Sequence, residues 1–334
     1  MAVDDRAIRL RPLPWQQLPW QRLVDQQNAG RQPHALLLTG PKGVGKQALA
    51  DALVARTLCH QPEEFACGHC HGCAMLASGY HPDLMRVTPL GSSRQIRIDS
   101  VREISDFTHQ TAQQGGYRVI LIQPAEALNV AAANALLKSL EEPGGRTLFL
   151  LLSDVPSRLP ATIRSRCQQW RMTIPVRDDC IPWLADRLGD ENDARFWLQV
   201  AGGLPLLATE LADAEARGLR QQLHDVFDAL VRGAEPVAEA ARLSSQPVES
   251  VLWYGIAWLE DLIRLGLSGD SEQVSNPDLL PLYRQAAKNG RVHDWFRLLD
   301  FAREQRRLLA RGGNPNAQLV LEAWLVRWSS LLRS

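Results

Sequence analysis

The stretch Ala35-Leu-Leu-Leu-Thr-Gly40-Pro-Lys-Gly-Val-Gly-Lys46-Gln47 decides the fold of this chain. Its first four residues are apolar and predict a buried strand, and residues 48–58 carry apolar side chains at helical spacing. Between them, seven of the eight positions of the pattern Gly-x4-Gly-Lys-Ser/Thr are present. A strand, a glycine-rich turn and a helix in this order predict a phosphate-binding loop.

The loop has every residue that the phosphate-loop pattern requires except the last. Gly40, Gly43 and Gly45 allow backbone N–H groups to face phosphate oxygens, and Lys46 is placed to reach the terminal phosphates. The eighth position needs a hydroxyl for Mg²⁺, but Gln47 has a longer amide that is a poor octahedral ligand there. The loop therefore retains the means to bind ATP, whereas hydrolysis is not expected.

A second loss concerns the carboxylates that a nucleotide-hydrolysing site places after a neighbouring strand. The apolar strand predicted over residues 117–122 is followed by Gln123 and Pro124. Glu126 lies two residues further on, and we expect Pro124 to direct it away from the site. Two independent losses favour a degenerate ATPase site.

The rest of the chain divides into an α/β part and a helical part. Further apolar strands are predicted at 117–122 and 147–152, with a helix over 129–142 between them, which favours a parallel sheet covered on both faces. After about Met172 only helices are predicted, first short and then long and amphipathic. We expect an α/β domain over 1–171, a small helical lid over 172–210 and a helical domain over 211–334.

Four cysteines form a dense cluster in residues 59–73. Cys59, Cys67, Cys70 and Cys73 are spaced C-x7-C-x2-C-x2-C, which suits a tetrahedral structural Zn²⁺ site. A redox pair or buried free thiols are the alternatives. The histidines at positions 60, 69, 71 and 81 are able to replace one ligand, and Cys167 and Cys180 are expected to be ordinary buried cysteines.

Composition limits the function further. The 334 residues carry 37 basic and 37 acidic side chains, so no net charge draws the chain to nucleic acid or to an anionic membrane. The longest apolar run is far shorter than the ~20 residues that span a bilayer. No signal-peptide pattern is present, so we expect a cytoplasmic protein.

These motifs together resemble a known family. A phosphate loop, a four-cysteine insertion, the sequence Asn134-Ala-Leu-Leu-Lys-Ser-Leu-Glu-Glu-Pro143 and the tripeptide Ser165-Arg166-Cys167 resemble the bacterial clamp-loader subunits of DNA polymerase III, which belong to the AAA+ class. The resemblance implies that residues 211–334 form the collar by which subunits assemble into a ring. It implies γ/τ-type ATPase subunits and a δ-type subunit as partners, and contact with the sliding clamp and primed DNA through the complex.

The resemblance also implies roles for single residues. Active ATPase subunits of this family have a hydroxyl after the loop lysine and an Asp-Glu pair after the second strand, where this chain has Gln47, Gln123 and Pro124. It is therefore similar to the family member that does not hydrolyse ATP. Arg166 is implied to act in trans, in the ATP site of a neighbouring subunit. Its structural alternative is an arginine at a helix end, paired with a surface carboxylate.

Two other functions remain open. One is a self-sufficient AAA+ ATPase acting on DNA, with Lys46 as phosphate ligand and Glu126, Glu141 or Glu142 recruited for catalysis. The other is a DNA-binding module built on the cysteine cluster, although residues 59–73 contain no lysine or arginine. Nucleotidyl transfer is not expected in this chain and would belong to the polymerase holoenzyme that it joins.

Overall fold

The computed structural model describes residues 10–91, 93, 95–114, 116–288, 291–310, 313 and 315–333. By its internal contacts the chain forms two compact units. The first contains the residues up to Arg187 together with Gly203–Leu207, and the second contains Leu188–Gly202 together with the residues from Ala208 onward. The three-domain division, with its boundaries after residues 171 and 210, stays a prediction. Residues 1–9 of its first domain lie outside the described residues.

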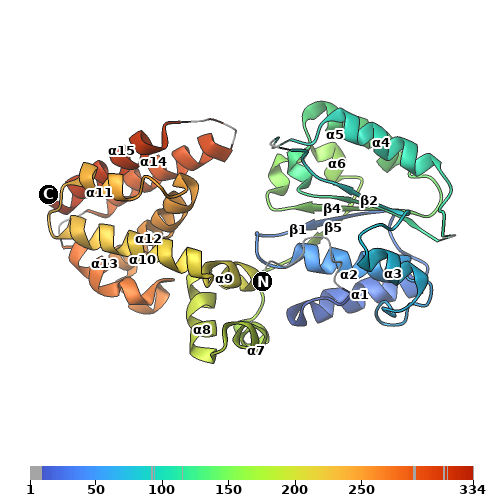
Figure 1. The fold of residues 1–334 in the computed structure, drawn as a ribbon, viewed down its shortest axis with the longest axis horizontal. Coiled ribbons are helices and arrows are strands. Elements are labelled where there is room, and N and C mark those ends of the chain that lie inside the picture. The colour runs from blue at the N-terminus through green and yellow to red at the C-terminus, as the bar shows by residue number, and fades with distance from the viewer. Residues whose placement is uncertain are drawn as a thin grey trace. The chain divides into compact units, whose positions relative to one another are not determined.

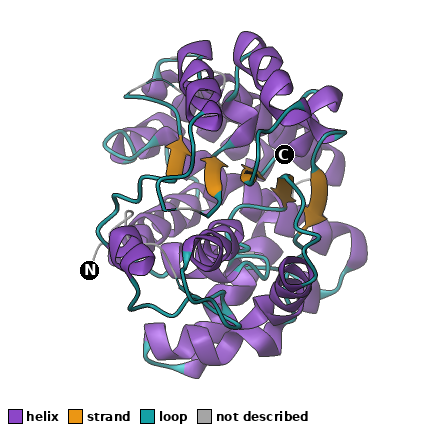
Figure 2. Ribbon diagram, turned by 90° about the vertical axis from the view of Figure 1, so that its right-hand side faces the viewer, coloured by secondary structure: helices purple, strands orange, loops and turns teal. Residues whose placement is uncertain are grey.

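The first unit is built on a five-stranded parallel sheet of order β2-β3-β4-β1-β5. Figure 2 shows the strands side by side as one sheet. In β1, Ala35 pairs with Phe149 of β4, and in β3, Arg118 pairs with Thr147. The strands are β1 Ala35–Thr39, β2 Leu84–Val87, β3 Arg118–Ile122, β4 Thr147–Ser153 and β5 Gln168–Arg171.

Helices cover both faces of this sheet (Figure 1). On one face, Leu36 and Leu38 pack in a core with side chains of α1 and α2, and on the other, Leu37 packs with side chains of α4 and α5. Alternate residues of β1, β3 and β4 therefore enter different cores, which explains why apolar residues follow one another in these three strands. The helices of this unit are α1 Gln17–Asn28, α2 Lys46–Leu58, α3 His71–Ala77, α4 Ile98–His109, α5 Val130–Glu141, α6 Ala161–Arg164 and α7 Arg177–Leu188.

The second unit is helical, as predicted. Its core gathers tryptophans around Phe227, whose ring centroid lies 4.5 Å from that of Trp328, 5.4 Å from Trp258 and 5.5 Å from Trp324. The helices are α8 Glu191–Val200, α9 Pro205–Leu211, which begins in the first unit, α10 Ala214–Val231, α11 Pro236–Arg242, α12 Val248–Ser268, α13 Leu280–Ala286, α14 Val292–Ala310 and α15 Ala317–Arg333. None of the described helices is long and apolar enough to cross a bilayer.

A buried carboxylate fixes the loop between α12 and α13. Asp261 is 1% exposed and accepts hydrogen bonds from the backbone N–H groups of Ser275 and Asn276, each at 2.8 Å. It also pairs with Arg264 at 2.8 Å. Since a buried charge is tolerated only when it is paired and hydrogen-bonded, these contacts hold the loop against α12.

Candidate functional site

The phosphate loop lies between β1 and α2, as the sequence predicts. Gly43 and Gly45 have φ angles of +90° and +99°, a region that side chains with a Cβ rarely adopt. A Cβ at Gly45 would lie 2.6 Å from Nε2 of Gln16 and 2.7 Å from Cδ1 of Leu13. Both glycines are therefore required by this backbone path.

The side chain of Lys46 is buried and turned onto its own loop. Its Nζ donates hydrogen bonds to the carbonyl oxygens of Gly40 at 2.7 Å and Pro41 at 2.9 Å. It also forms an ion pair with Asp154, with Nζ and Oδ1 2.5 Å apart. A phosphate entering this loop would have to displace these partners of the ammonium group.

Residues after β4 complete this arrangement. Ser153 is the last residue of β4, and Asp154, which follows it, contacts Lys46. Glu126 accepts hydrogen bonds at its Oε1 from the backbone N–H groups of Asp154 at 3.0 Å and Val155 at 3.2 Å. Glu126 therefore supports the segment that carries the lysine's partner.

The side chain of Gln47 lies along α2. Its Nε2 donates to Oδ1 of Asp51 at 2.9 Å, and the same oxygen pairs with Arg86 at 3.0 Å. After β3, the backbone N–H of Gln123 donates to the carbonyl of Val87 in the neighbouring strand. The groups at these positions are amides, so they do not supply the hydroxyl and carboxylates that Mg²⁺ chemistry uses.

The N-terminal segment holds the phosphate loop from outside, and sequence reasoning missed this contact. Trp15 donates from Nε1 to the carbonyl of Val44 at 3.0 Å, and Gln16 donates from Nε2 to the carbonyl of Gly45 at 2.8 Å. Neither residue belongs to a motif, and about 29 positions separate each from its partner. No local sequence pattern reports such a contact.

Arg166 follows α6 and is about one-third exposed. One Nη forms an ion pair with Glu141 at the end of α5, and the other donates to the carbonyl of Thr162 at 2.9 Å. This is the pairing with a surface carboxylate that the sequence leaves as the structural alternative. Arg166 and Lys46 have no partner in common among these contacts.

The four cysteines converge. Their Sγ atoms all lie within 4.8 Å of one another, with 3.8 Å between Cys59 and Cys70 and 3.9 Å between Cys67 and Cys73. A tetrahedron of thiolates about 2.3 Å from Zn²⁺ has edges of about 3.8 Å, so the set has the size of a zinc site. Among the described residues, the four thiols make up this group without a histidine.

Backbone N–H groups surround the thiols as they would surround thiolate ligands. Cys67, Cys70 and Cys73 donate from their backbone N–H groups to the sulfur of the preceding cysteine of the set, at 3.3, 3.4 and 3.5 Å. Burial raises the pKa of Cys70, but hydrogen bonds from the backbone N–H groups of Cys73 and His60 and from the neighbouring thiols bring that pKa down to about 6. The thiolate form that binds metal is thus favoured at this position. Burial instead raises the pKa of Cys59 and of Cys73 above the ordinary value of a thiol.

The cysteine module packs on the N-terminal part of the chain. Phe65 stacks on Trp20 of α1 with 5.7 Å between ring centroids, and Arg11 lies over the same phenyl ring at 4.9 Å. Arg56 of α2 donates to the carbonyl of Glu63 at 2.9 Å. These contacts attach the module to α1, α2 and the segment that reaches the phosphate loop.

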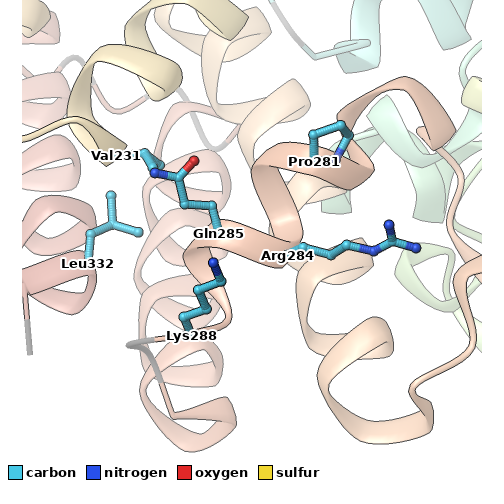
Figure 3. Close-up of a pocket in the computed structure, with 6 residues that line it drawn as sticks. All are labelled: Val231, Pro281, Arg284, Gln285, Lys288 and Leu332. Carbon is cyan, nitrogen blue, oxygen red and sulfur yellow. The ribbon is translucent and has the colours of Figure 1, made fainter.

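A pocket of about 410 Å³ lies in the second unit and is lined by none of the predicted site residues. Figure 3 shows the side chains of Gln285 and Lys288 near Leu332, with Arg284 extending to the other side. The lining residues are Val231, Pro281, Arg284, Gln285, Lys288 and Leu332.

The phosphate loop on a doubly covered parallel sheet, with a four-cysteine insertion and a separate helical unit, defines an AAA+ protein of the clamp-loader type. Two family models match the chain: "DNA polymerase III, delta subunit" over residues 15–175, and "DNA polymerase III, delta subunit, C terminal" over residues 215–330. Together the two models cover most of the chain, which belongs to this family of DNA polymerase III subunits.

Two relatives place the chain among the DNA polymerase III delta' subunits. The DNA polymerase III subunit delta' of Pseudomonas aeruginosa is 39% identical over 95% of this chain and 97% of its own length. That of Escherichia coli is 33% identical, over 84% of each chain. A gamma subunit-related protein of Thermotoga maritima aligns with 93% of this chain and 99% of its own, at 18% identity and a TM-score of 0.44.

Proposed function

We propose that this chain is a clamp-loader subunit that does not hydrolyse ATP and that supplies Arg166 to the ATP site of a neighbouring subunit. In this role it joins γ/τ-type and δ-type subunits in a ring through its C-terminal helices and helps to load the sliding clamp on primed DNA. One observation carries the first part: Gln47 and Gln123 stand where a magnesium site needs a hydroxyl and a carboxylate.

The contacts of Lys46 support the absence of hydrolysis. Its ammonium group is paired with Asp154 and with two loop carbonyls. Of the carboxylates that a self-sufficient ATPase would recruit, Glu126 accepts two backbone N–H groups and Glu141 pairs with Arg166. Turnover by the purified chain at rates typical of AAA+ motors, abolished by Lys46→Ala, would overturn this part of the proposal.

The position of Arg166 supports the trans role. The side chain is partly exposed at the end of a short helix, and a planar guanidinium with five N–H donors suits a phosphoryl group that gains charge. An arginine acting in trans is worth about 10³–10⁵-fold in rate at the site that it serves.

The test uses a clamp loader reconstituted with its ATPase subunits. Arg166→Ala should remove turnover at the neighbouring site and reduce clamp loading on primed DNA. Arg31→Ala is a matched control, because Arg31 is exposed and its side chain has no hydrogen bond or ion pair with the described residues. Unchanged ATP turnover and clamp loading in the Arg166→Ala ring would remove the trans role.

We also propose that the four cysteines hold a structural Zn²⁺. The Sγ separations fit a tetrahedron, and four protein ligands close the coordination shell, leaving no position for a substrate. Elemental analysis of protein purified without chelator should give one zinc per chain. Serine at Cys70 should lower this content, whereas serine at Cys180, a buried cysteine outside the cluster, should leave it unchanged.

A further inference from the structure

We propose that Glu141 is a positioning residue for Arg166, holding the guanidinium in the orientation in which a neighbouring subunit's ATP meets it. This inference rests on the proposed trans role of Arg166. It begins from an ion pair that joins two segments 25 positions apart: Glu141 is the last residue of α5, and Arg166 follows α6, which packs on α5.

The guanidinium of Arg166 is held at two points. One Nη pairs with Oε1 of Glu141, and the other donates to the carbonyl oxygen of Thr162 at 2.9 Å. Two contacts to different nitrogens of a planar group fix its plane as well as its position. An arginine has five N–H donors, so donors remain for the oxygens of a phosphate.

The pair contributes little to folding. The side chain of Glu141 is 50% exposed and that of Arg166 is 33% exposed, so water screens their attraction. Neither side chain belongs to the two cores of the sheet. The ion pair therefore contributes little to stability. Its main effect is to restrict the position of the long, flexible side chain of Arg166.

Restricting Arg166 before the neighbour's nucleotide arrives lowers the conformational entropy lost on reaching the transition state. The Glu141 carboxylate also offsets part of the positive charge of Arg166. The ion pair therefore does not strengthen the binding of ATP in the ground state. An interaction that is realised mainly in the transition state changes kcat and leaves KM nearly constant.

The experiment measures steady-state ATP turnover of the reconstituted clamp loader at saturating clamp and primed DNA. Glu141→Ala should lower kcat by about two- to fivefold, the size of a partly exposed ion pair, with KM for ATP unchanged. Glu141→Gln keeps an oxygen acceptor at the same reach and should recover part of this loss. Glu103→Ala, an exposed residue of α4 without an ion pair among the described residues, is the control and should match the wild type.

Combining Glu141→Ala with Arg166→Ala distinguishes failure of the positioning role of Glu141 from failure of the trans role of Arg166. If Glu141 acts through Arg166, the double variant should be no slower than Arg166→Ala alone. A kcat that Glu141→Ala leaves unchanged or raises, in a ring where Arg166→Ala is defective, would overturn the positioning role and leave the trans role standing. If Arg166→Ala itself has no effect, the proposed function fails first.

Discussion

Removing the proposed Zn²⁺ from the cysteine module should open residues 59–73 while the sheet stays folded. Within this segment only Cys59, Gly72 and Cys73 are buried, so the module has almost no apolar core of its own. Structural zinc contributes about 10–16 kcal/mol in small zinc peptides. The Phe65–Trp20 stack, the main aromatic contact of the module, is worth only about 0.5–1.5 kcal/mol beyond its buried area.

The size of the effect follows from the hydrogen bonds that depend on the metal site. Four backbone N–H groups, those of Gln61, Cys67, Cys70 and Cys73, donate to cysteine sulfurs. At about 0.5–1.5 kcal/mol each, their loss removes about 2–6 kcal/mol of local protection. Amide exchange in this segment should then accelerate at least about thirtyfold.

The assay is hydrogen exchange by mass spectrometry before and after chelation, with peptides from β3 and β4 as the internal reference. Serine at Cys70 should reproduce the chelated pattern, and serine at Cys180 should resemble the untreated protein. Complete metal extraction that leaves exchange in 59–73 unchanged would refute the argument that the metal, rather than packing, holds the module.

Two predictions concern the helical unit. Gly255→Ala should destabilise it by about 1–3 kcal/mol or more in urea unfolding followed by tryptophan fluorescence, because the new Cβ would lie 2.1 Å from Cη2 of Trp324. Gly218→Ala in α10, where a Cβ meets nothing within 4 Å, should instead stabilise by about 0.5–1 kcal/mol, and equal effects of the two changes would contradict this packing. Asp261→Ala leaves the N–H groups of Ser275 and Asn276 without their acceptor and should cost about 3–5 kcal/mol, whereas a loss below ~1 kcal/mol would show that the loop does not depend on this carboxylate.

The sequence predicts the centre of the sheet better than its edges. The strands that became β1, β3 and β4 each contain a run of consecutive apolar residues because both of their faces are buried. No strand is predicted from the sequence at β2 or β5, the two edge strands. The residues of β5, Gln-Gln-Trp-Arg, are mostly exposed, so they lack the apolar run by which a buried strand is recognised.

The candidate site shows the same limit. Lys46, Arg166 and the four cysteines belong to local patterns, and the structure places the cysteines together as predicted. Their partners do not belong to such patterns: Asp154 meets Lys46 from the end of another strand, and Glu141 meets Arg166 from another helix. Contacts between distant segments depend on how the chain packs. The spacing of residues along the sequence does not predict them.

Helix α2 joins the phosphate loop to the cysteine cluster as a rigid spacer. Lys46 is its first residue and Cys59 follows its last, and its 13 residues span about 20 Å. Deleting one residue inside α2 would turn Cys59 by about 100° around the helix axis and shift it by about 1.5 Å, taking its sulfur out of the tetrahedron. A cysteine module moved into another AAA+ scaffold would therefore have to carry α2 with its length intact.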